Sequence, residues 1–168
     1  MELIQQAPDV SAYLAADEAI DHGHPLVRET AARLRSETED AYTYAAAAFE
    51  FVRDTIIHSA DSGDTRVTWR ASDVLATRNG ICHAKSHALV ALRLPGRGRW
   101  DRQDPRGNRP GVDTRFSLDG ERLAWPVRPE FNEMDYPVLY VAPHPAVLHG
   151  LRAAVDRAQL WRTLPAAL

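Results

Sequence analysis

The sequence predicts an α+β fold in which helices come first and a small antiparallel sheet follows. Apolar residues recur at helical spacing through the first half of the chain, up to Leu92. After Gly98 the pattern changes to short strand-like runs, and the turn-forming stretch from Asp104 to Gly111 separates them. A length of 168 residues fits one domain, which we place at residues 1–168.

Start signals and apolar stripes define the helices of the first half. Asp9 or Ser11 begins a short segment to Ile20, and Pro25 suits the start of the next helix. That helix carries an apolar stripe of Leu26, Val27, Ala31 and Leu34. The other predicted elements are a helix from Asp40 through Ile57 with Tyr44, Ala48, Phe51 and Val52 on one side, a loop at 61–64, a helix from Ser72 through Ala76 closed by the turn pair Asn79–Gly80, and a helix over 82–92.

Three short strands make up the predicted sheet, at residues 99–104, 123–127 and 138–141. Pro126 limits the second strand to an edge of the sheet. A last helix is expected from Pro145 to about Trp161. Helices separated along the chain from an antiparallel sheet are typical of the α+β class.

Composition indicates an ordinary globular protein with 45% hydrophobic residues, 26% charged residues and a net charge of −3. This balance argues against general binding to nucleic acid or membrane, and we interpret the basic stretch Arg93–Arg109 as a solvated loop. The first ten residues lack the regions of a signal peptide, and no apolar run is long enough to cross a bilayer. Because one cysteine cannot form an internal disulfide, we expect a cytoplasmic protein.

That single cysteine, Cys82, is the candidate nucleophile. It lies at the predicted start of a helix, where unpaired N–H groups and the helix dipole favour the thiolate and lower the thiol pKa. The same N–H groups can hold the oxyanion that forms when a thiolate attacks a carbonyl, and Gly80 leaves room for a substrate backbone. The alternative is a buried structural cysteine, the commonest fate of a free thiol.

Helix and strand lengths bring Asp104 into the same region. The predicted helix advances about 15 Å from Cys82 to Leu92, and the returning strand from Gly98 to Asp104 covers about 20 Å. Asp104 would then lie near the level of Cys82, where a carboxylate can orient a catalytic imidazole. A turn cap before Pro105 is the simpler interpretation of this residue taken by itself.

Two motifs in this order resemble those of bacterial transglutaminase-like domain proteins. The segment similar to their nucleophile motif comprises Ala71–Leu75 and Gly80–His87, the segment similar to their acidic motif comprises Asp104–Asn108 and Pro110–Asp113, and the stretches Arg122–Ala124 and Tyr136–Pro137 fit the downstream course. The resemblance therefore spans most of the chain. It implies a papain-like transglutaminase core with Cys82 as nucleophile and Asp104 as the residue that orients the imidazole.

The chain departs from this family where the catalytic histidine is expected. In such proteins, strands after the nucleophile helix carry that histidine, whereas here the helix leads directly into Arg93–Gly96. Two strands and their turns need roughly 20 to 30 residues, and no histidine lies between His87 and His144. The segment that would supply the base is therefore missing, and the sheet is expected to be smaller (trimmed) by these strands.

Whether another histidine replaces the missing base stays open from the sequence. His83 should point about a quarter-turn away from the thiol, and His87 lies more than a turn further along the helix. His144 and His149 could reach the site only through tertiary packing, and we interpret His149 as a partly exposed helix residue and His58 as a helix cap. His83 and His87 have the four-residue spacing of a metal-binding pair, with Cys82 as a further ligand, but no other ligand is evident and we expect neither metal nor cofactor.

Two functions remain open for the whole chain. In the first, Cys82 attacks a peptide or amide carbonyl, forms a thioester and passes the acyl group to water or an amine. Lack of an imidazole would impair this reaction by about two to four orders of magnitude. In the alternative, the fold is catalytically inactive and acts as a binding module, whose exposed sheet edge accepts a partner chain or a second copy. The abrupt join near Arg93 also fits a truncated product of a working enzyme.

Overall fold

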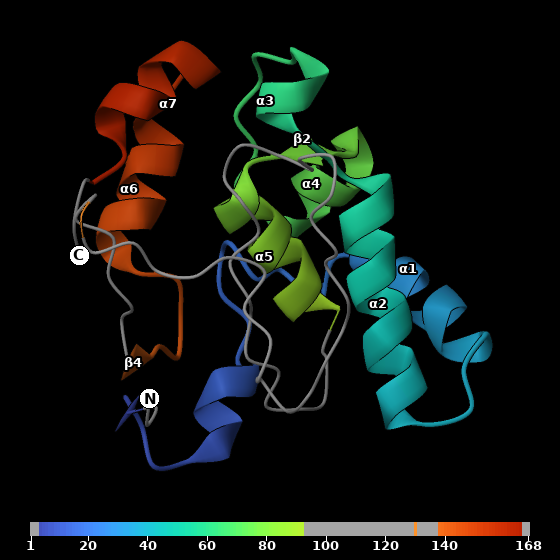
Figure 1. Ribbon diagram of the computed structural model, residues 1–168. Helices are drawn as coiled ribbons and strands as arrows, with labels where there is room; N and C mark the ends of the chain where they lie inside the picture. The colour runs from blue at the N-terminus through green and yellow to red at the C-terminus, as the bar shows by residue number, and fades with distance from the viewer. Residues whose placement is uncertain (1–3, 93–129, 131–137, 166–168) are drawn as a thin grey trace.

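The computed structural model describes residues 4–92, 130 and 138–165, which form an α+β fold of helices with two small sheets (Figure 1). The predicted fold class is confirmed. The predicted antiparallel pairing is wrong for the described strands, because both pairs are parallel. Strand β1 (Ile4–Gln5) pairs with β4 (Val138–Leu139), and β2 (Ile57–His58) pairs with β3 (Asn79–Gly80). Each pair joins segments far apart in the chain, as parallel strands require. The strands expected at 99–104 and 123–127 lie outside the described residues.

The first helices begin where the sequence predicts. A 3₁₀ helix, η1 (Val10–Leu14), starts after Asp9, whose side chain caps Ser11 N–H at 2.8 Å. Helix α1 (Pro25–Ser36) follows the cap residue His24 and buries Val27, Thr30 and Leu34. Helix α2 (Ala41–Thr55) begins with a capping box between Asp40 and Thr43. It ends two residues earlier than expected, because Ile57 and His58 enter strand β2.

Between α2 and the candidate nucleophile, the structure differs from the prediction in three details. Residues expected to form a loop are partly helical, as α3 (Ser59–Ser62), with His58 as its N-cap. Helix α4 (Ala71–Thr77) begins one residue before Ser72, whose hydroxyl donates instead to Asp21 at 2.5 Å. Arg78 adopts the left-handed conformation, with φ of 54°, and Asn79–Gly80 forms β3. Asn79 and Gly80, which were expected to close the helix, therefore pair with β2 instead.

The remaining helices are α5 (Cys82–Ala91), α6 (Pro145–Ala153) and α7 (Arg157–Thr163). Helix α5 has its expected extent to within one residue. The single last helix predicted from Pro145 to Trp161 is two helices, because the chain leaves helical geometry at Ala154 and Asp156 starts α7 with its side chain as cap. Strand β4 is shorter than the predicted strand at 138–141.

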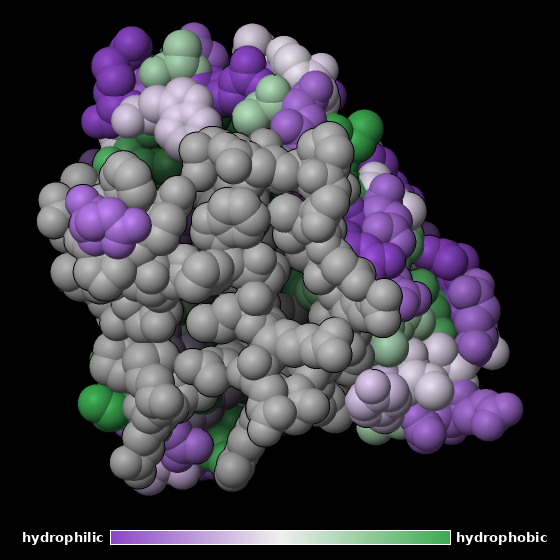
Figure 2. Space-filling model, viewed as in Figure 1, coloured by the Kyte–Doolittle hydropathy of each residue, from purple (hydrophilic) through white to green (hydrophobic). Residues whose placement is uncertain are grey.

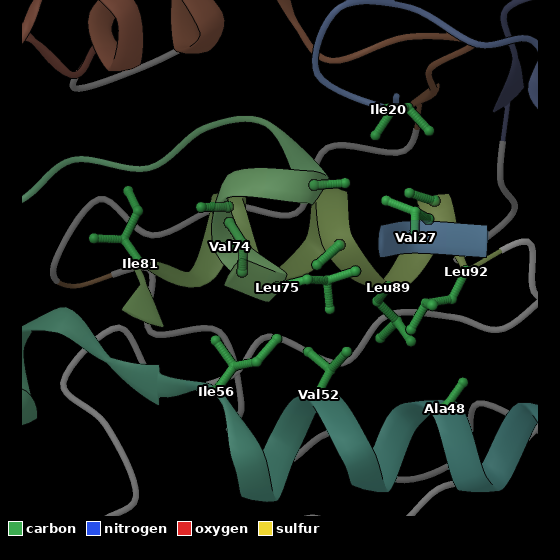
Figure 3. Packing of buried hydrophobic residues seen from close by; sticks show 14 of the residues in the cluster. Ile20, Val27, Ala48, Val52, Ile56, Val74, Leu75, Ile81, Leu89 and Leu92 are labelled. Carbon is green, nitrogen blue, oxygen red and sulfur yellow. The ribbon is translucent and has the colours of Figure 1, made fainter. Parts of the chain in front are cut away.

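One hydrophobic core joins these helices. Helix α5 packs against both α2 and α4, and α1 also packs on α2 and α4 (Figure 1). Ala48, Val52 and Ile56 of the α2 segment face Leu75 and residues of α5 (Figure 3). Buried residues of α6 and α7 belong to the same cluster: Val147, Leu151, Ala154 and Leu160. Hydrophilic side chains cover the outer edge formed by α1 and α2 (Figure 2). The core thus fixes α5, and with it Cys82, from several sides.

Among the described residues, no helix combines the length and apolar character that crossing a membrane requires.

Candidate functional site

Cys82 is the first residue of α5, directly after strand β3 and the N-cap residue Ile81. The side chain of Ile81 makes no capping hydrogen bond, and the first bond of the helix runs from Lys85 N–H to Ile81 O at 2.9 Å. N–H groups in the first turn are therefore free of helical partners. Those of His83 and Cys82 favour the thiolate form of Cys82. The predicted placement of the thiol at a helix start is confirmed.

Burial nevertheless raises the pKa of the Cys82 thiol above its ordinary value. The N–H groups of His83 and Cys82, and the positive charge of Lys85, lower this pKa, but desolvation outweighs them. The depressed pKa expected from the helix start is therefore wrong. The raised pKa keeps the sulfur in its neutral thiol form, and the residue as a whole is only partly buried.

His83 lies beside the thiol, contrary to the prediction that it points away. Its Nδ1 is 3.5 Å from Cys82 Sγ, within the range of a hydrogen bond to sulfur. Side chains tilt toward the N-terminus of their helix, so an imidazole at the second position can fold back onto the first residue. Desolvation, with a smaller effect of His87, lowers the pKa of His83. Its neutral form, which can accept a proton, is thereby favoured.

The prediction that Gly80 leaves room for a substrate backbone is wrong. The residue is buried, and a Cβ atom placed there would lie 3.1 Å from Thr68 Oγ1 and 3.2 Å from Ala84 Cβ. Its small size lets β3 pack against the first turn of α5. Gly80 thus positions Cys82 through packing inside the protein.

The ring of His87, more than a turn further along α5, contacts the backbone of Trp69. It is buried, and its Nδ1 lies 2.7 Å from the Trp69 carbonyl oxygen. Trp69 is itself held by guanidinium groups of Arg70 at 4.5 Å and Arg152 at 4.7 Å from its ring centre. His87 and Trp69 therefore connect α5 to α6. Within the described ranges, no three potential ligands of the His, Cys, Asp and Glu types gather into a metal site.

His58, His144 and His149 lie at helix starts or on the surface. His58 Nδ1 accepts from Ala60 N–H at 3.1 Å, so it caps the beginning of α3 rather than the end of α2. His144 caps α6 in the same way, and His149 is exposed on that helix, as expected. Asp104, the predicted orienting residue, lies outside the described residues.

Lys85 is a neighbour of Cys82 that the sequence interpretation missed. Of the 20 Lys and Arg residues in the chain, Lys85 is the only lysine. It lies one turn after the only cysteine and is 6% exposed, with its Nζ 3.4 Å from the carbonyl oxygen of Arg53. A lone lysine close to a lone cysteine, in a chain that otherwise uses arginine, was the signal that could have identified it.

A cavity outlined by described residues lies elsewhere. Its volume is about 760 Å³, and its walls come from the His22–Gly23 turn, from α1 and from Ala91 in the last turn of α5. Cys82 is at the first turn of that ten-residue helix, about 15 Å away along its axis. The cavity is therefore not part of the thiol site.

Comparison with known proteins adds no relative: no family model, curated protein or solved structure matches this chain.

Proposed function

We propose that the chain is a thiol-dependent acyltransferase or amide hydrolase of the transglutaminase-like kind, with Cys82 as its nucleophile and His83 as its base. The observation that carries the proposal is the 3.5 Å contact between Cys82 Sγ and His83 Nδ1. A nucleophile and a base within hydrogen-bond reach are the minimal elements of covalent thiol catalysis. The substrate class is a peptide or another amide, and the single thiol supports a cytoplasmic location.

The protonation states suggest how this pair works. Thiol and imidazole both rest neutral at pH 7, because burial raises the pKa of Cys82 and lowers that of His83. His83 therefore accepts the thiol proton as sulfur attacks the carbonyl carbon, instead of holding a preformed ion pair. The imidazolium then returns the proton to the leaving amine. N–H groups at the start of α5 are available to the developing oxyanion.

Asp104 remains the proposed third member of the site. When Nδ1 of His83 accepts from the thiol, its Nε2 carries the hydrogen, and a carboxylate is a suitable acceptor for that N–H group. This role rests on the resemblance of the Asp104–Asn108 segment, which lies outside the described residues. Replacing Asp104 with Asn tests it through acylation kinetics.

The alternative, a catalytically inactive binding module, is favoured by one specific observation. The raised pKa of Cys82 leaves little thiolate at neutral pH, as in structural cysteines. The two functions differ in what they require of His83. Only the enzyme needs the imidazole to activate the sulfur.

Acylation by 4-nitrophenyl acetate separates the two functions. Because the chain has one cysteine, the rapid release of nitrophenol that is lost in Cys82→Ala reports on Cys82. We expect this burst in the wild-type chain, a loss of about 10²- to 10⁴-fold in its rate in His83→Gln, and no burst in Cys82→Ala. His149→Gln is the matched control, since His149 is exposed and remote from the thiol in the chain.

Two results would reject the enzyme. In the first, His83→Gln acylates as fast as the wild-type chain. In the second, the native thiol reacts only when the chain unfolds. Either result leaves the binding module as the remaining function.

A further inference from the structure

Lys85 is buried where a charged side chain rarely lies. It is 6% exposed, and it packs between α5 and the end of α2, where its Nζ approaches the Arg53 carbonyl oxygen. The carboxylates that interact with the ammonium group are Asp54 of α2 and Asp61 of α3. Lysine is among the residues least often fully buried, because desolvating an ammonium ion is costly. The chain bears this cost at its only lysine.

Helix geometry places Lys85 on the turn next to Cys82. Residues three apart on a helix have Cβ atoms about 5 to 6 Å from one another. Side chains tilt toward the helix N-terminus, so the stem of Lys85 starts beside the turn that carries Cys82, and its Nζ ends at the Arg53 carbonyl oxygen. At about 100° per residue, Lys85 lies about 60° from Cys82 on one side and His83 about 100° away on the other. The two groups are near enough for the Lys85 charge to lower the pKa of the Cys82 thiol, although burial outweighs this effect.

The amine is also nucleophilic under mild conditions. Burial lowers the pKa of Lys85 from 10.5 to about 8, although Asp54, Asp61 and Cys82 oppose this shift. About half of the side chains therefore carry a free amine at pH 8, whereas an exposed lysine is almost fully protonated there. A free amine beside a thioester is a potential acyl acceptor.

We propose that Lys85 is an internal acyl acceptor, which takes an acyl group from the Cys82 thioester and becomes a stable amide. The ligand class is an activated acyl donor, such as an ester or thioester of a small carboxylic acid. This inference rests on the proposed function of Cys82 as a nucleophile. It adds a covalent modification site within the same helix turn.

The transfer step needs no further reactant. The lone pair of the neutral Lys85 amine attacks the thioester carbonyl carbon, so a C–N bond forms while the C–S bond breaks. Sulfur leaves with the bonding electrons. The proton that the amine loses is transferred to this sulfur, directly or through His83. Thioester and amine thus become amide and thiol, which regenerates Cys82.

Burial makes this route depend on Cys82. An acyl donor in solution meets an amine that is only 6% exposed, whereas the partly buried thiol is within reach. Once the acyl group is on sulfur, its transfer to Lys85 is intramolecular, and intramolecular reactions of well-oriented groups have very high effective concentrations. Acylation of Lys85 should therefore be slow wherever Cys82 is absent.

The test treats the full chain at pH 8 with 4-nitrophenyl acetate and follows hydroxylamine-resistant acetyl groups by mass spectrometry. Trypsin does not cleave after an acylated lysine, so modification of Lys85 leaves the peptide from Asn79 to Arg93 intact. We expect Lys85 to be acetylated at least about 100-fold faster in the wild-type chain than in Cys82→Ala. In Lys85→Met the acetyl group should stay on Cys82 as a hydroxylamine-labile thioester. The N-terminal amine, mapped in its own peptide, serves as the internal control.

The outcomes separate this inference from the function on which it rests. A wild-type thioester that hydrolyses without any amide at Lys85 overturns the internal acceptor and leaves the nucleophile in place. Equal acetylation of Lys85 in Cys82→Ala also overturns it, because the donor then reaches the amine directly. If neither the wild-type chain nor Lys85→Met forms a thioester, the proposed function itself fails. The comparison of wild type with Cys82→Ala needs no variant at Lys85.

Discussion

Lys85 loses its hydration when α5 packs against α2, and the fall of its pKa from 10.5 to about 8 links this burial to stability. Between these values the unfolded chain binds more protons than the folded chain, so stability rises with pH across this window. Below about pH 8 the folded chain bears the full cost, on the order of 3 kcal/mol. We therefore expect Lys85→Met to unfold at a higher urea concentration than the wild type at pH 7.

The pH dependence of this difference is the check. The advantage of Lys85→Met should shrink between pH 8 and 10.5, as the wild-type lysine becomes neutral in both states. A difference in unfolding free energy that stays constant from pH 7 to 10.5 would show that the ammonium group is not desolvated.

His87 should make the folded chain less stable at acid pH. Burial lowers its pKa below 6.5, so below that pH the unfolded chain binds more protons and stability is lost as pH falls. Gln at this position can still donate to the Trp69 carbonyl but does not titrate. We expect urea unfolding at pH 7 and pH 5 to show a smaller acid loss for His87→Gln than for the wild type. Parallel losses in both chains would assign the acid sensitivity to other groups.

For single residues of the site, some features were predictable from the sequence and others were not. The position of Cys82 at a helix start follows from local pattern and is confirmed. The thiol pKa was wrong in direction because it depends on burial by segments distant in the chain. The contact of His83 with the sulfur was missed because helical angle was considered without the backward tilt of the side chain. Lys85 was recognisable from composition alone.

At the scale of elements, helix starts were predictable and helix ends were less so. Asp9, Pro25 and Asp40 mark starts through local hydrogen bonds or a fixed φ angle, which the sequence encodes directly. The ends of α2 and α4 depend on the pairing of β2 with β3, which joins positions about 20 residues apart. Parallel pairing of this kind leaves no hairpin signal in the sequence.

The contact of α6 with α7 gives a test at this scale. A Cβ atom on Gly150 would lie 2.7 Å from the backbone oxygen of Thr163, which is too close without movement of one helix. We expect Gly150→Ala to lower the unfolding free energy by about 1 to 3 kcal/mol, despite the higher helix propensity of alanine. Gly23 is the matched control, because nothing lies within 4 Å of its Cβ position and its φ is not positive. Gly23→Ala should be neutral or stabilising by up to about 1 kcal/mol, as measured by urea unfolding. Equal effects of the two changes would mean that α6 and α7 separate readily.

At the scale of the whole molecule, the described helices share one core, and polar contacts hold α7 to the α3 region. Arg157 N–H donates to the Thr65 carbonyl oxygen at 2.9 Å, and its guanidinium contacts the Ser59 carbonyl oxygen. Buried residues from α1, α2, α4, α5, α6 and α7 form a single cluster. A chain built in this way should unfold as one cooperative unit, which is also what a single domain over residues 1–168 requires.

Cys82 makes this cooperativity measurable, because its thiol is partly buried by the same packing that positions α5. Leu75→Ala removes a side chain that is 2% exposed in the core and should cost about 2 to 5 kcal/mol, whereas Leu14→Ala, at 53% exposure, should cost little. Urea unfolding is followed by circular dichroism and, in parallel, by the rate at which Cys82 is alkylated. We expect both signals to share one midpoint, and Leu75→Ala to lower both midpoints equally. If the thiol becomes reactive well before helicity is lost, the site opens as a separate unit. The geometry of Cys82, His83 and Lys85 would then describe only part of the native population.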